Sequence, residues 1–260
     1  MILAIDVGNT NIVLGLIEDG KISSVAPRIA SDVHKTDYEF AVAIENMLDF
    51  VGVDATEAEG AIISSVVWPL TSTLQSAVKM LTGKKALVVG SGLKTGLNIC
   101  IDDPGEVGAD LVVGAVGALT VAETPLIVVD MGTATTVTVI DDGNRFLGGA
   151  ILPGLRLSMD ALSSGTSLLP RVSLDAPKKV ISTNTVECMQ SGAIFGSAAM
   201  IDGMIDRMEA ELGKRATVVA TGGLAGSVTP FCTHKIIYEP DLLLKGLSVL
   251  WEKNRRPSRT

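Results

Sequence analysis

Residues 2–20 read ILAIDVGNTNIVLGLIEDG, and a similar run, LIVVDMGTATTVTVIDDG, returns at residues 126–143. In both runs a β-rich segment ends in an aspartate, a glycine and a hydroxyl residue follow, and a second β-rich segment ends in a turn. The runs differ by one residue in spacing and begin about half a chain apart. Their shared order favours an internal duplication, in which each half opens on the same strand, acidic glycine loop and strand.

The sequence around these runs alternates between strand and helix patterns. Thr36 and Glu39 form a capping box at the start of a helical pattern. Further strands are predicted near 21–27, 60–67, 86–89, 145–151 and 216–220, and further helices near 70–82, 109–122, 154–163, 185–212 and 240–252. Such alternation predicts an α/β fold of mostly parallel mixed sheets with helices on both faces. The predicted domains are residues 1–122 and 123–253, followed by a frayed basic tail, 254–260.

Composition excludes several classes of protein. The formal charge of -8 and the aromatic content of 3% argue against a nucleic-acid partner, which requires clustered cations and stacking rings. The three cysteines are odd in number and far apart, which favours a reducing compartment over a disulfide framework. No basic segment precedes the first apolar run, and no run reaches the roughly 20 apolar residues of a membrane helix. We therefore expect a cytoplasmic protein without a membrane partner.

The acidic glycine loops suit phosphate chemistry. Glycine lets backbone amides approach phosphate oxygens, and a neighbouring hydroxyl adds a donor. Asp6 and Asp130 cannot donate to phosphate, so their expected task is to hold a cation or a water on Mg²⁺. Either loop alone could be an ordinary hairpin turn, whereas two copies in equivalent halves favour a bound nucleotide. Gly222 and Gly223, between a strand and a helix, suit contact with adenosine or ribose, or form a simple turn.

Asp110 is the candidate catalytic group. Phosphoryl transfer to an alcohol needs a carboxylate that accepts the hydroxyl proton, and Asp110 opens an otherwise apolar predicted helix. The same position is also favourable for any acidic residue, because the helix dipole stabilises negative charge at its N-terminus. The residue pattern alone leaves both interpretations open.

In addition, the chain resembles the type III pantothenate kinases, members of the acetate and sugar kinase, Hsp70 and actin superfamily. The resemblance runs over nearly the whole length. The matching segments are Asp6–Asn11, Lys94–Asn98, Pro104–Asp110, Asp130–Thr136, Gly148-Gly149, Pro153-Gly154, Asn184-Thr185, Gln190–Gly192 and Ala220–Gly223. The resemblance implies duplicated ribonuclease H-like (actin-like ATPase) domains with mixed β-sheets flanked by helices.

It also implies ATP-dependent phosphorylation of pantothenate to 4′-phosphopantothenate, the first step of coenzyme A biosynthesis, with Mg²⁺ and a monovalent cation (K⁺ or NH₄⁺). Asp110 would be the base, and Asp130 would lie at the monovalent-cation site. The family works as a homodimer, with the long helix at 185–212 near the subunit contact. The expected ATP-binding residues are Asp6, Val7, Gly8, Asn9, Thr10, Asn11, Ile12, Val13, Thr133, Gly222 and Gly223. The expected acceptor-binding residues are Gly108, Ala109, Asp110, Leu111, Ile101 and Thr185.

Three positions depart from the family pattern, all on the acceptor side. Leu111 replaces the arginine of the Gly-x-Asp-Arg motif, Ile101 stands where a tyrosine is usual, and Gly165 aligns with a second arginine. A charged hydrogen bond to the pantothenate carboxylate is worth about 1.5–3 kcal/mol. Three interpretations follow: a pantothenate kinase with a rearranged pocket, a kinase of the same fold for a different small alcohol acceptor, or a weakly catalytic nucleotide-binding regulator similar to the Bvg accessory factor.

Overall fold

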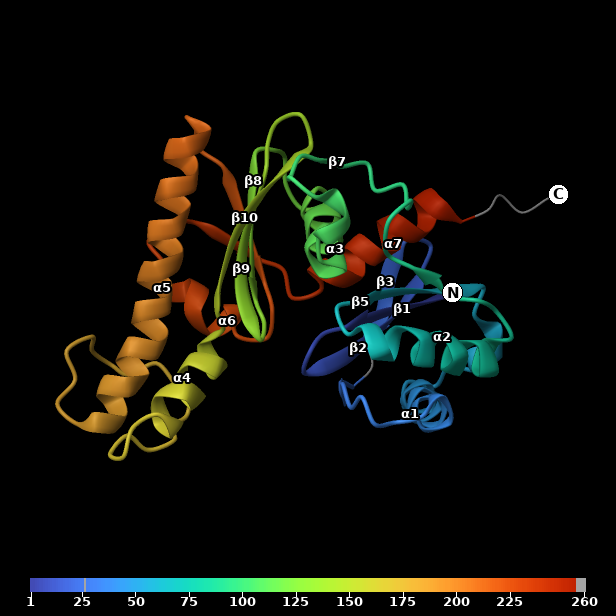
Figure 1. The fold of residues 1–260 in the computed structure, drawn as a ribbon, viewed down its shortest axis with the longest axis horizontal. Helices are drawn as coiled ribbons and strands as arrows, with labels where there is room; N and C mark the ends of the chain where they lie inside the picture. Colours follow the sequence, from blue (N-terminus) through green and yellow to red (C-terminus); the bar gives the residue numbers. More distant parts are fainter. Residues whose placement is uncertain (26, 256–260) are drawn as a thin grey trace. The chain divides into compact units, whose positions relative to one another are not determined.

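The computed structural model describes residues 1–25 and 27–255 and consists of two compact units (Figure 1). Unit 1 comprises Met1–Gly96, Asp103–Thr120 and the described chain from Leu242 onward, and unit 2 comprises Leu97–Asp102 and Val121–Asp241. Within these described residues, none of the helices combines the length and apolar character that crossing a membrane requires.

Unit 1 is built on a sheet whose strand order is β3-β2-β1-β5-β6, with β4 paired to β2. Strand β1 runs antiparallel to β2 and parallel to β5. The strands are β1 (Ile2–Val7), β2 (Asn11–Glu18), β3 (Lys21–Val25), β4 (Ile29–Ala30), β5 (Gly60–Ser65) and β6 (Leu87–Val88). The predicted strand near 21–27 thus ends at Val25, and Ala26 lies outside the described residues.

The helices of unit 1 are α1 (Asp37–Phe50), α2 (Trp68–Thr82), α3 (Ala109–Ala118) and α7 (Leu242–Asn254), with short 3-10 turns at Ala55–Glu57 and Pro104–Glu106. The predicted capping box at the start of α1 is confirmed, since Thr36 accepts from the Glu39 amide and Glu39 from the Thr36 amide. Alternate residues of β1 pack into the core with α1 and α2. Helix α7 also packs on the strands β1 and β5, and α3 packs on β5.

Unit 2 is built on a sheet of order β12-β11-β8-β9-β10-β7. Its strands are β7 (Asn98–Ile99), β8 (Leu126–Met131), β9 (Ala134–Ile140), β10 (Arg145–Pro153), β11 (Thr217–Thr221) and β12 (Ile236–Tyr238). Its helices are α4 (Leu155–Ser164), α5 (Thr185–Leu212) and α6 (Ala225–Val228), followed by a 3-10 turn at Thr229–Phe231. Helices α4, α5 and α6 contribute the buried residues that pack against β8, β9 and β11.

The two sheets share one plan. In each, the first strand lies between an antiparallel hairpin partner and a parallel strand: β1 between β2 and β5, and β8 between β9 and β11. A third strand extends the hairpin side, and a further parallel strand extends the other side. The duplication predicted from the sequence is therefore confirmed by topology.

The compact units divide differently from the predicted domains. Helix α7 was expected in the second domain but belongs to unit 1, where it packs on α3. Gly117 and Gly246 permit this packing, because a side chain at either position would meet the backbone of the opposing helix. Residues 97–102 belong to unit 2, because β7 pairs with β10. Of the predicted tail, residues 256–260 lie outside the described residues, while Asn254 ends α7.

Candidate active site

The unit 1 loop, residues 8–10, joins β1 to β2. The last strand pair is Val7 with Ile12, and the Gly8 amide donates to the Asn11 carbonyl at 3.0 Å. Ser31 anchors the loop from outside, since its hydroxyl donates to the Gly8 carbonyl at 2.6 Å. Asn9, Thr10 and Asn11 are exposed, while Asp6 at the end of β1 is half-buried. The hairpin thus presents polar side chains and backbone beside a partly shielded carboxylate.

The unit 2 loop, residues 132–133, repeats this arrangement with one residue fewer. The last strand pair is Met131 with Thr135, and the Gly132 amide donates to the Ala134 carbonyl at 3.0 Å. Gly132 and Thr133 are exposed, and Asp130 is half-buried. The one-residue difference in spacing between the two sequence runs is therefore the difference in loop length.

Gly222 lies directly beside the unit 2 loop. A side chain there would reach within 2.7 Å of Asp130 Oδ1 and 2.6 Å of the Met131 carbonyl oxygen, and its φ of +96° also favours glycine. Thr221, the residue before it, pairs with Asp130 across the parallel strands β11 and β8. The structure thus brings the predicted residues Asp130 and Gly222 together in unit 2.

Asp110 lies in the first turn of α3 in unit 1. Its Oδ1 accepts a hydrogen bond from the Leu111 amide at 2.8 Å, and a methyl group at Gly108 would lie 2.5 Å from the same oxygen. Burial raises the pKa of the Asp110 carboxyl, although backbone hydrogen bonds from Leu111 and from its own amide oppose that shift. A raised pKa makes the carboxylate a stronger proton acceptor, which suits a general base.

The predicted acceptor residues are divided between the units. Gly108, Ala109, Asp110 and Leu111 form the start of α3 in unit 1. Ile101 belongs to unit 2, where a side chain at Gly148 would lie 3.5 Å from its Cγ2. Gly165 ends α4, and Thr185 opens α5. Leu111 is therefore the departure that adjoins the candidate base directly.

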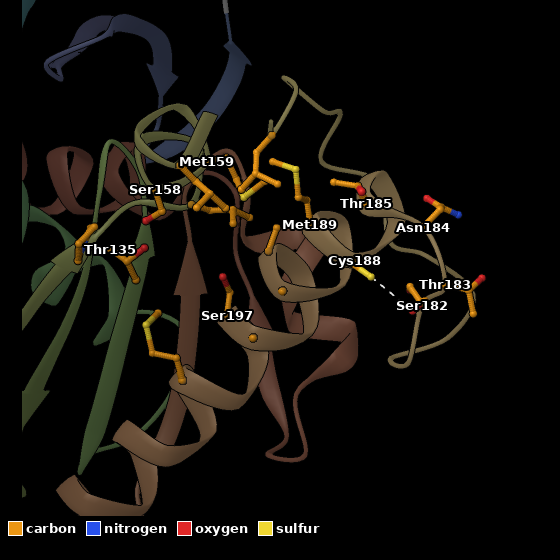
Figure 2. A pocket seen from close by; sticks show the side chains of 18 residues that line it. Thr135, Ser158, Met159, Ser182, Thr183, Asn184, Thr185, Cys188, Met189 and Ser197 are labelled. Atoms are coloured by element: carbon orange, nitrogen blue, oxygen red, sulfur yellow. Dashed lines mark hydrogen bonds between the residues drawn. The ribbon is translucent and has the colours of Figure 1, made fainter. Parts of the chain in front are cut away.

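Unit 2 contains a pocket of about 990 Å³ between α4 and α5. Figure 2 shows Thr185 at its rim beside Asn184 and Thr183, with Met159 and Met189 further in. Its lining consists of Thr135, Pro153, Leu155, Ser158, Met159, Leu162, Leu169, Ser182, Thr183, Asn184, Thr185, Cys188, Met189, Gly192, Ala193, Gly196, Ser197 and Met200. All of these side chains are uncharged, so specificity there rests on hydroxyl and amide groups.

Of this lining, sequence reasoning identified only Thr185. The spacing of Gly192, Gly196 and Gly203 on α5 is typical of close helix packing, with a partner that the spacing does not identify. Within this chain a side chain at Gly192 or Gly196 would meet nothing within 4 Å, and both glycines line the pocket. The paired glycines on α5 were therefore the available signal for this hollow.

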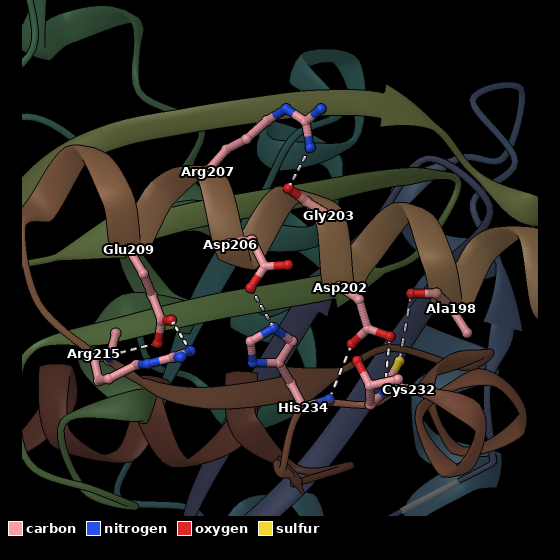
Figure 3. A network of polar contacts seen from close by, with 11 residues as sticks. Ala198, Asp202, Gly203, Asp206, Arg207, Glu209, Arg215, Cys232 and His234 are labelled. Atoms are coloured by element: carbon pink, nitrogen blue, oxygen red, sulfur yellow. Dashed lines mark hydrogen bonds and ion pairs between the residues drawn. The ribbon is translucent and has the colours of Figure 1, made fainter.

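A second polar network holds the segment around His234 to α5 (Figure 3). Asp202 accepts from the Thr233 and His234 amides at 2.7 and 3.1 Å, and His234 Nε2 lies 3.0 Å from Asp206 Oδ1. Glu209, Asp206 and His234 have the chemistry of metal ligands and place ligand atoms within 4.8 Å of one another. Both Glu209 oxygens already accept hydrogen bonds, from Arg215 and the Ala216 amide. These contacts hold the segments that lead into β11 and β12 against α5.

Comparison with protein families matches residues 2–207 to the type III pantothenate kinase family. Two relatives bear that name. One, from Moorella thermoacetica, is 43% identical over 256 residues, covering 98% of this chain and 100% of the relative. The other, from Bacillus cytotoxicus, is 41% identical over 254 residues, covering 98% of this chain and 97% of the relative.

Solved structures support the fold alone. A putative 2-dehydro-3-deoxygalactonokinase from Sinorhizobium meliloti matches with a TM-score of 0.58 at 14% identity, covering 97% of this chain and 98% of that one. The (R)-2-hydroxyglutaryl-CoA dehydratase component A of Acidaminococcus fermentans matches with a TM-score of 0.56 at 15% identity, covering 95% and 94%. Together with the two equivalent sheets, these matches confirm the predicted duplicated actin-like ATPase fold.

Proposed function

Because the chain belongs to the type III pantothenate kinase family, we propose that it transfers a phosphoryl group from ATP to pantothenate. The product, 4′-phosphopantothenate, begins coenzyme A biosynthesis. The observation that carries the proposal is the pair of acidic glycine loops at equivalent places in two equivalent sheets. Asp110 supplies the carboxylate that the reaction additionally requires.

Each loop has a proposed task toward ATP. Residues 6–13 of unit 1 and Thr133 of unit 2 are the proposed ATP-binding residues, and Gly222 and Gly223 are proposed to contact the adenosine. The exposed polar residues among them, Asn9, Thr10, Asn11 and Thr133, carry side-chain groups that suit phosphate oxygens. Asp6 would hold Mg²⁺, directly or through a bound water, because Mg²⁺ prefers oxygen ligands. Asp130 would hold K⁺ or NH₄⁺, because its carboxylate can bind a metal ion or accept hydrogen bonds from ammonium. Bound Mg²⁺ would neutralise phosphate charge.

Asp110 acts on the acceptor. Its carboxylate takes the proton from the pantothenate hydroxyl as that oxygen forms a bond to the terminal phosphorus, and the bond from phosphorus to the ADP oxygen breaks. Burial supports this role, because it raises the pKa of Asp110 and so strengthens the carboxylate as a base. Gly108 leaves the space that this carboxylate occupies.

The acceptor side supports a second candidate function. Leu111 puts an aliphatic group beside the base where the family has an arginine, and the pocket that includes Thr185 has an uncharged lining. An uncharged alcohol would need no cation to pair with, whereas the carboxylate of pantothenate would. Phosphorylation of a neutral small alcohol is therefore the alternative that the residues favour.

We also propose that the chain works as a homodimer in the cytoplasm, with α5 near the subunit contact. Large apolar side chains beside the pocket support a second copy, since Leu168 is 88% exposed and Ile181 is 85% exposed. The three cysteines, Cys100, Cys188 and Cys232, are free thiols, as a reducing compartment would keep them.

A coupled ADP-release assay with saturating ATP, Mg²⁺ and K⁺ tests the reaction. Turnover with millimolar pantothenate supports the leading proposal. Turnover only with neutral alcohols would replace pantothenate by the second candidate. Nucleotide binding without turnover on any acceptor would contradict both and indicate a regulatory relative.

Leu111→Arg tests the acceptor pocket directly. A charge-assisted hydrogen bond is worth about 1.5–3 kcal/mol, so the KM for pantothenate should fall roughly tenfold to a hundredfold if its carboxylate lacks a cation. Val42→Arg, on the exposed face of α1 in the same unit, controls for added charge. An unchanged KM in Leu111→Arg would show that other groups already hold the carboxylate.

A further inference from the structure

Two buried hydroxyls stand out in the described part of the chain. Ser64 Oγ and Thr221 Oγ1 are its only buried side-chain oxygen or nitrogen atoms without a hydrogen-bond partner, and the residues are 0% and 1% exposed. Other buried hydroxyls are satisfied: Thr82 donates to the Val78 carbonyl at 2.8 Å, and Ser191 to the Val180 carbonyl at 2.6 Å. A buried hydroxyl without a hydrogen-bond partner lowers the stability of the fold, so its presence suggests a function other than stability.

The two hydroxyls occupy equivalent places. Ser64 on β5 pairs in register with Asp6 on β1, and Thr221 on β11 pairs in register with Asp130 on β8. Both strand pairs are parallel. Each unpaired hydroxyl is therefore the lateral neighbour of the aspartate that ends the first strand of its own unit.

In each unit, the aspartate and the hydroxyl residue lie on one face of the sheet, opposite the face that packs into the core with the helices named below. Ile5 and Val7 pack into the core with α1 and α2, so alternation places Asp6 and its register partner Ser64 on the opposite face. In unit 2, Val129 and Met131 pack into the core with α5, which places Asp130 and Thr221 on the opposite face. Neighbouring strands lie about 4.8 Å apart, so one small ligand can reach both side chains of a pair.

The chemistry of these pairs is that of a hydrated cation site. A carboxylate can only accept hydrogen bonds, whereas a hydroxyl can accept, donate, or offer a lone pair to a cation. A water or cation beside the aspartate would supply the partner that the hydroxyl lacks. An alanine or valine in either place would avoid the cost of an unpaired hydroxyl, yet the chain carries a hydroxyl in both units.

We propose that Ser64 and Thr221 are positioning residues for the two cations, each supplying an oxygen, directly or through one water, to the cation held by its neighbouring aspartate. Ser64 serves Mg²⁺ beside Asp6, and Thr221 serves the monovalent cation beside Asp130. This inference rests on the proposed function, which gives Asp6 and Asp130 those cations. It adds one hydroxyl to each cation site and assigns the two hydroxyls to different ions.

Thermal unfolding of the full chain provides a readout independent of turnover. With ATP fixed, the melting temperature is followed while Mg²⁺ is titrated at saturating K⁺, and then while K⁺ is titrated at saturating Mg²⁺. Ser64→Ala should raise the Mg²⁺ midpoint about threefold to tenfold and leave the K⁺ midpoint unchanged. Thr221→Val should do the reverse, and Thr221→Ser, which keeps the hydroxyl, should restore the wild-type K⁺ midpoint.

Thr82→Val is the matched control, because it removes a buried hydroxyl that is already bonded. It should lower the melting temperature without moving either midpoint. Ser64→Ala and Thr221→Val should leave the melting temperature of the ligand-free protein unchanged or raised, since they remove an unpaired polar group.

The outcomes separate this inference from the proposed function. Wild-type stabilisation by ATP and both cations, with unshifted midpoints in Ser64→Ala and Thr221→Val, overturns the roles of the hydroxyls and leaves the kinase proposal standing. If Ser64→Ala shifts the K⁺ midpoint and Thr221→Val shifts the Mg²⁺ midpoint, the assignment of the two ions is wrong. No nucleotide response in the wild type sinks both proposals. If Thr221→Val does not fold, Thr221→Ala and the Ser64 arm give the same decision.

Discussion

The hairpins that contain Asp6 and Asp130 are similar, and the two units differ more in the parallel strand that lies beside each hairpin. Each hairpin closes with a glycine amide donating across the loop at 3.0 Å, and each is flanked by a parallel strand bearing a buried hydroxyl. After Thr221 the chain turns at Gly222, with φ +96°. After Ser64 the strand β5 continues to Ser65, which pairs with Val7. The chain therefore turns directly after the buried hydroxyl residue in unit 2, whereas in unit 1 it continues as a strand for one more residue.

The units differ more strongly in what surrounds this shared frame. Unit 1 carries Asp110 on α3, the candidate base, at a half-buried helix start. Unit 2 carries the 28-residue helix α5 and the uncharged pocket beside it. Duplication therefore supplies two similar acidic loops, whereas the proposed base and the pocket each belong to one unit.

The largest expected effect tests the asymmetry directly. Asp110→Asn should lower kcat about a hundredfold to ten-thousandfold, because it removes the proton acceptor. Nucleotide affinity should change little, since ATP is assigned to the acidic loops. Rate measurements under saturating substrates, with calorimetry for ATP, check both expectations. A variant that keeps most of its rate would remove Asp110 from the mechanism.

The same variant has a predicted stability signature. Burial raises the folded-state pKa of Asp110 above the usual value of 3.8, so the native state binds more protons than the unfolded state, and stability falls as pH rises from 3.8 through the folded-state pKa. Asp110→Asn should therefore melt above the wild type at neutral pH, and the gap should close as pH falls toward 3.8. Wild-type kcat should fall at low pH, as the base becomes protonated.

The next effect tests whether the two loops bind different cations. Asp6→Asn should raise the Mg²⁺ concentration needed for half-maximal rate about tenfold to a hundredfold, and Asp130→Asn should do so for K⁺. Rates measured across both cation titrations give the answer, with each variant serving as the other's control. Identical responses would mean that the loops are interchangeable and that the assignment of separate ions is wrong.

A smaller effect concerns the tight closure of unit 2. Gly222→Ala combines a positive φ with a contact 2.6 Å from the Met131 carbonyl oxygen, so it should cost about 1–3 kcal/mol of unfolding free energy. Gly20→Ala is the matched control, since Gly20 has φ +75° with nothing within 4 Å. Chemical denaturation measures both. Equal losses would show that strain alone matters and that Gly222 is not packed against Asp130.

Much of the fold follows from local pattern. The two strands within residues 2–20, the capping box at Thr36 and the long helix 185–212 were predictable, because alternation, caps and periodicity are local signals. The position of α7 in unit 1 was not, because it depends on small residues meeting across α3 and α7, far apart in the sequence. Strands β7 and β12 were missed as well, and each spans only two or three residues.

The candidate site, like the fold, was predictable where local motifs mark its residues and not where distant segments come together. Asp6, Asp130 and Asp110 carry motifs, so sequence could assign them chemistry. The hydroxyls of Ser64 and Thr221 matter only through strand register, which pairs residues 58 and 91 positions apart, and no local pattern marks them. The pocket likewise arises from the packing of α4 against α5, with Gly192 and Gly196 as its faint local sign.

The smallest predicted effect compares the second turns of the two units. In unit 1, Asp19 and Gly20 both have positive φ, as a tight two-residue hairpin turn requires. In unit 2, Asp141 accepts from the Gly143 and Arg145 amides at 2.9 and 3.0 Å, and from Arg145 Nε at 2.7 Å. The Arg145 guanidinium holds the pKa of the Asp141 carboxyl below its usual value.

Asp141→Asn should therefore lower the melting temperature at pH 7 by about 2–4 °C, because it loses the charged bond to Arg145. A lowered folded-state pKa contributes stability above the usual value of 3.8, and that contribution is lost as pH falls through the folded-state pKa. The difference from wild type should be constant near neutrality and shrink below pH 3.8. Asp19→Asn, at the equivalent turn, should change little, since asparagine tolerates positive φ. Equal losses in the two variants would mean that both turns depend on charge, and that the ion pair does not distinguish unit 2.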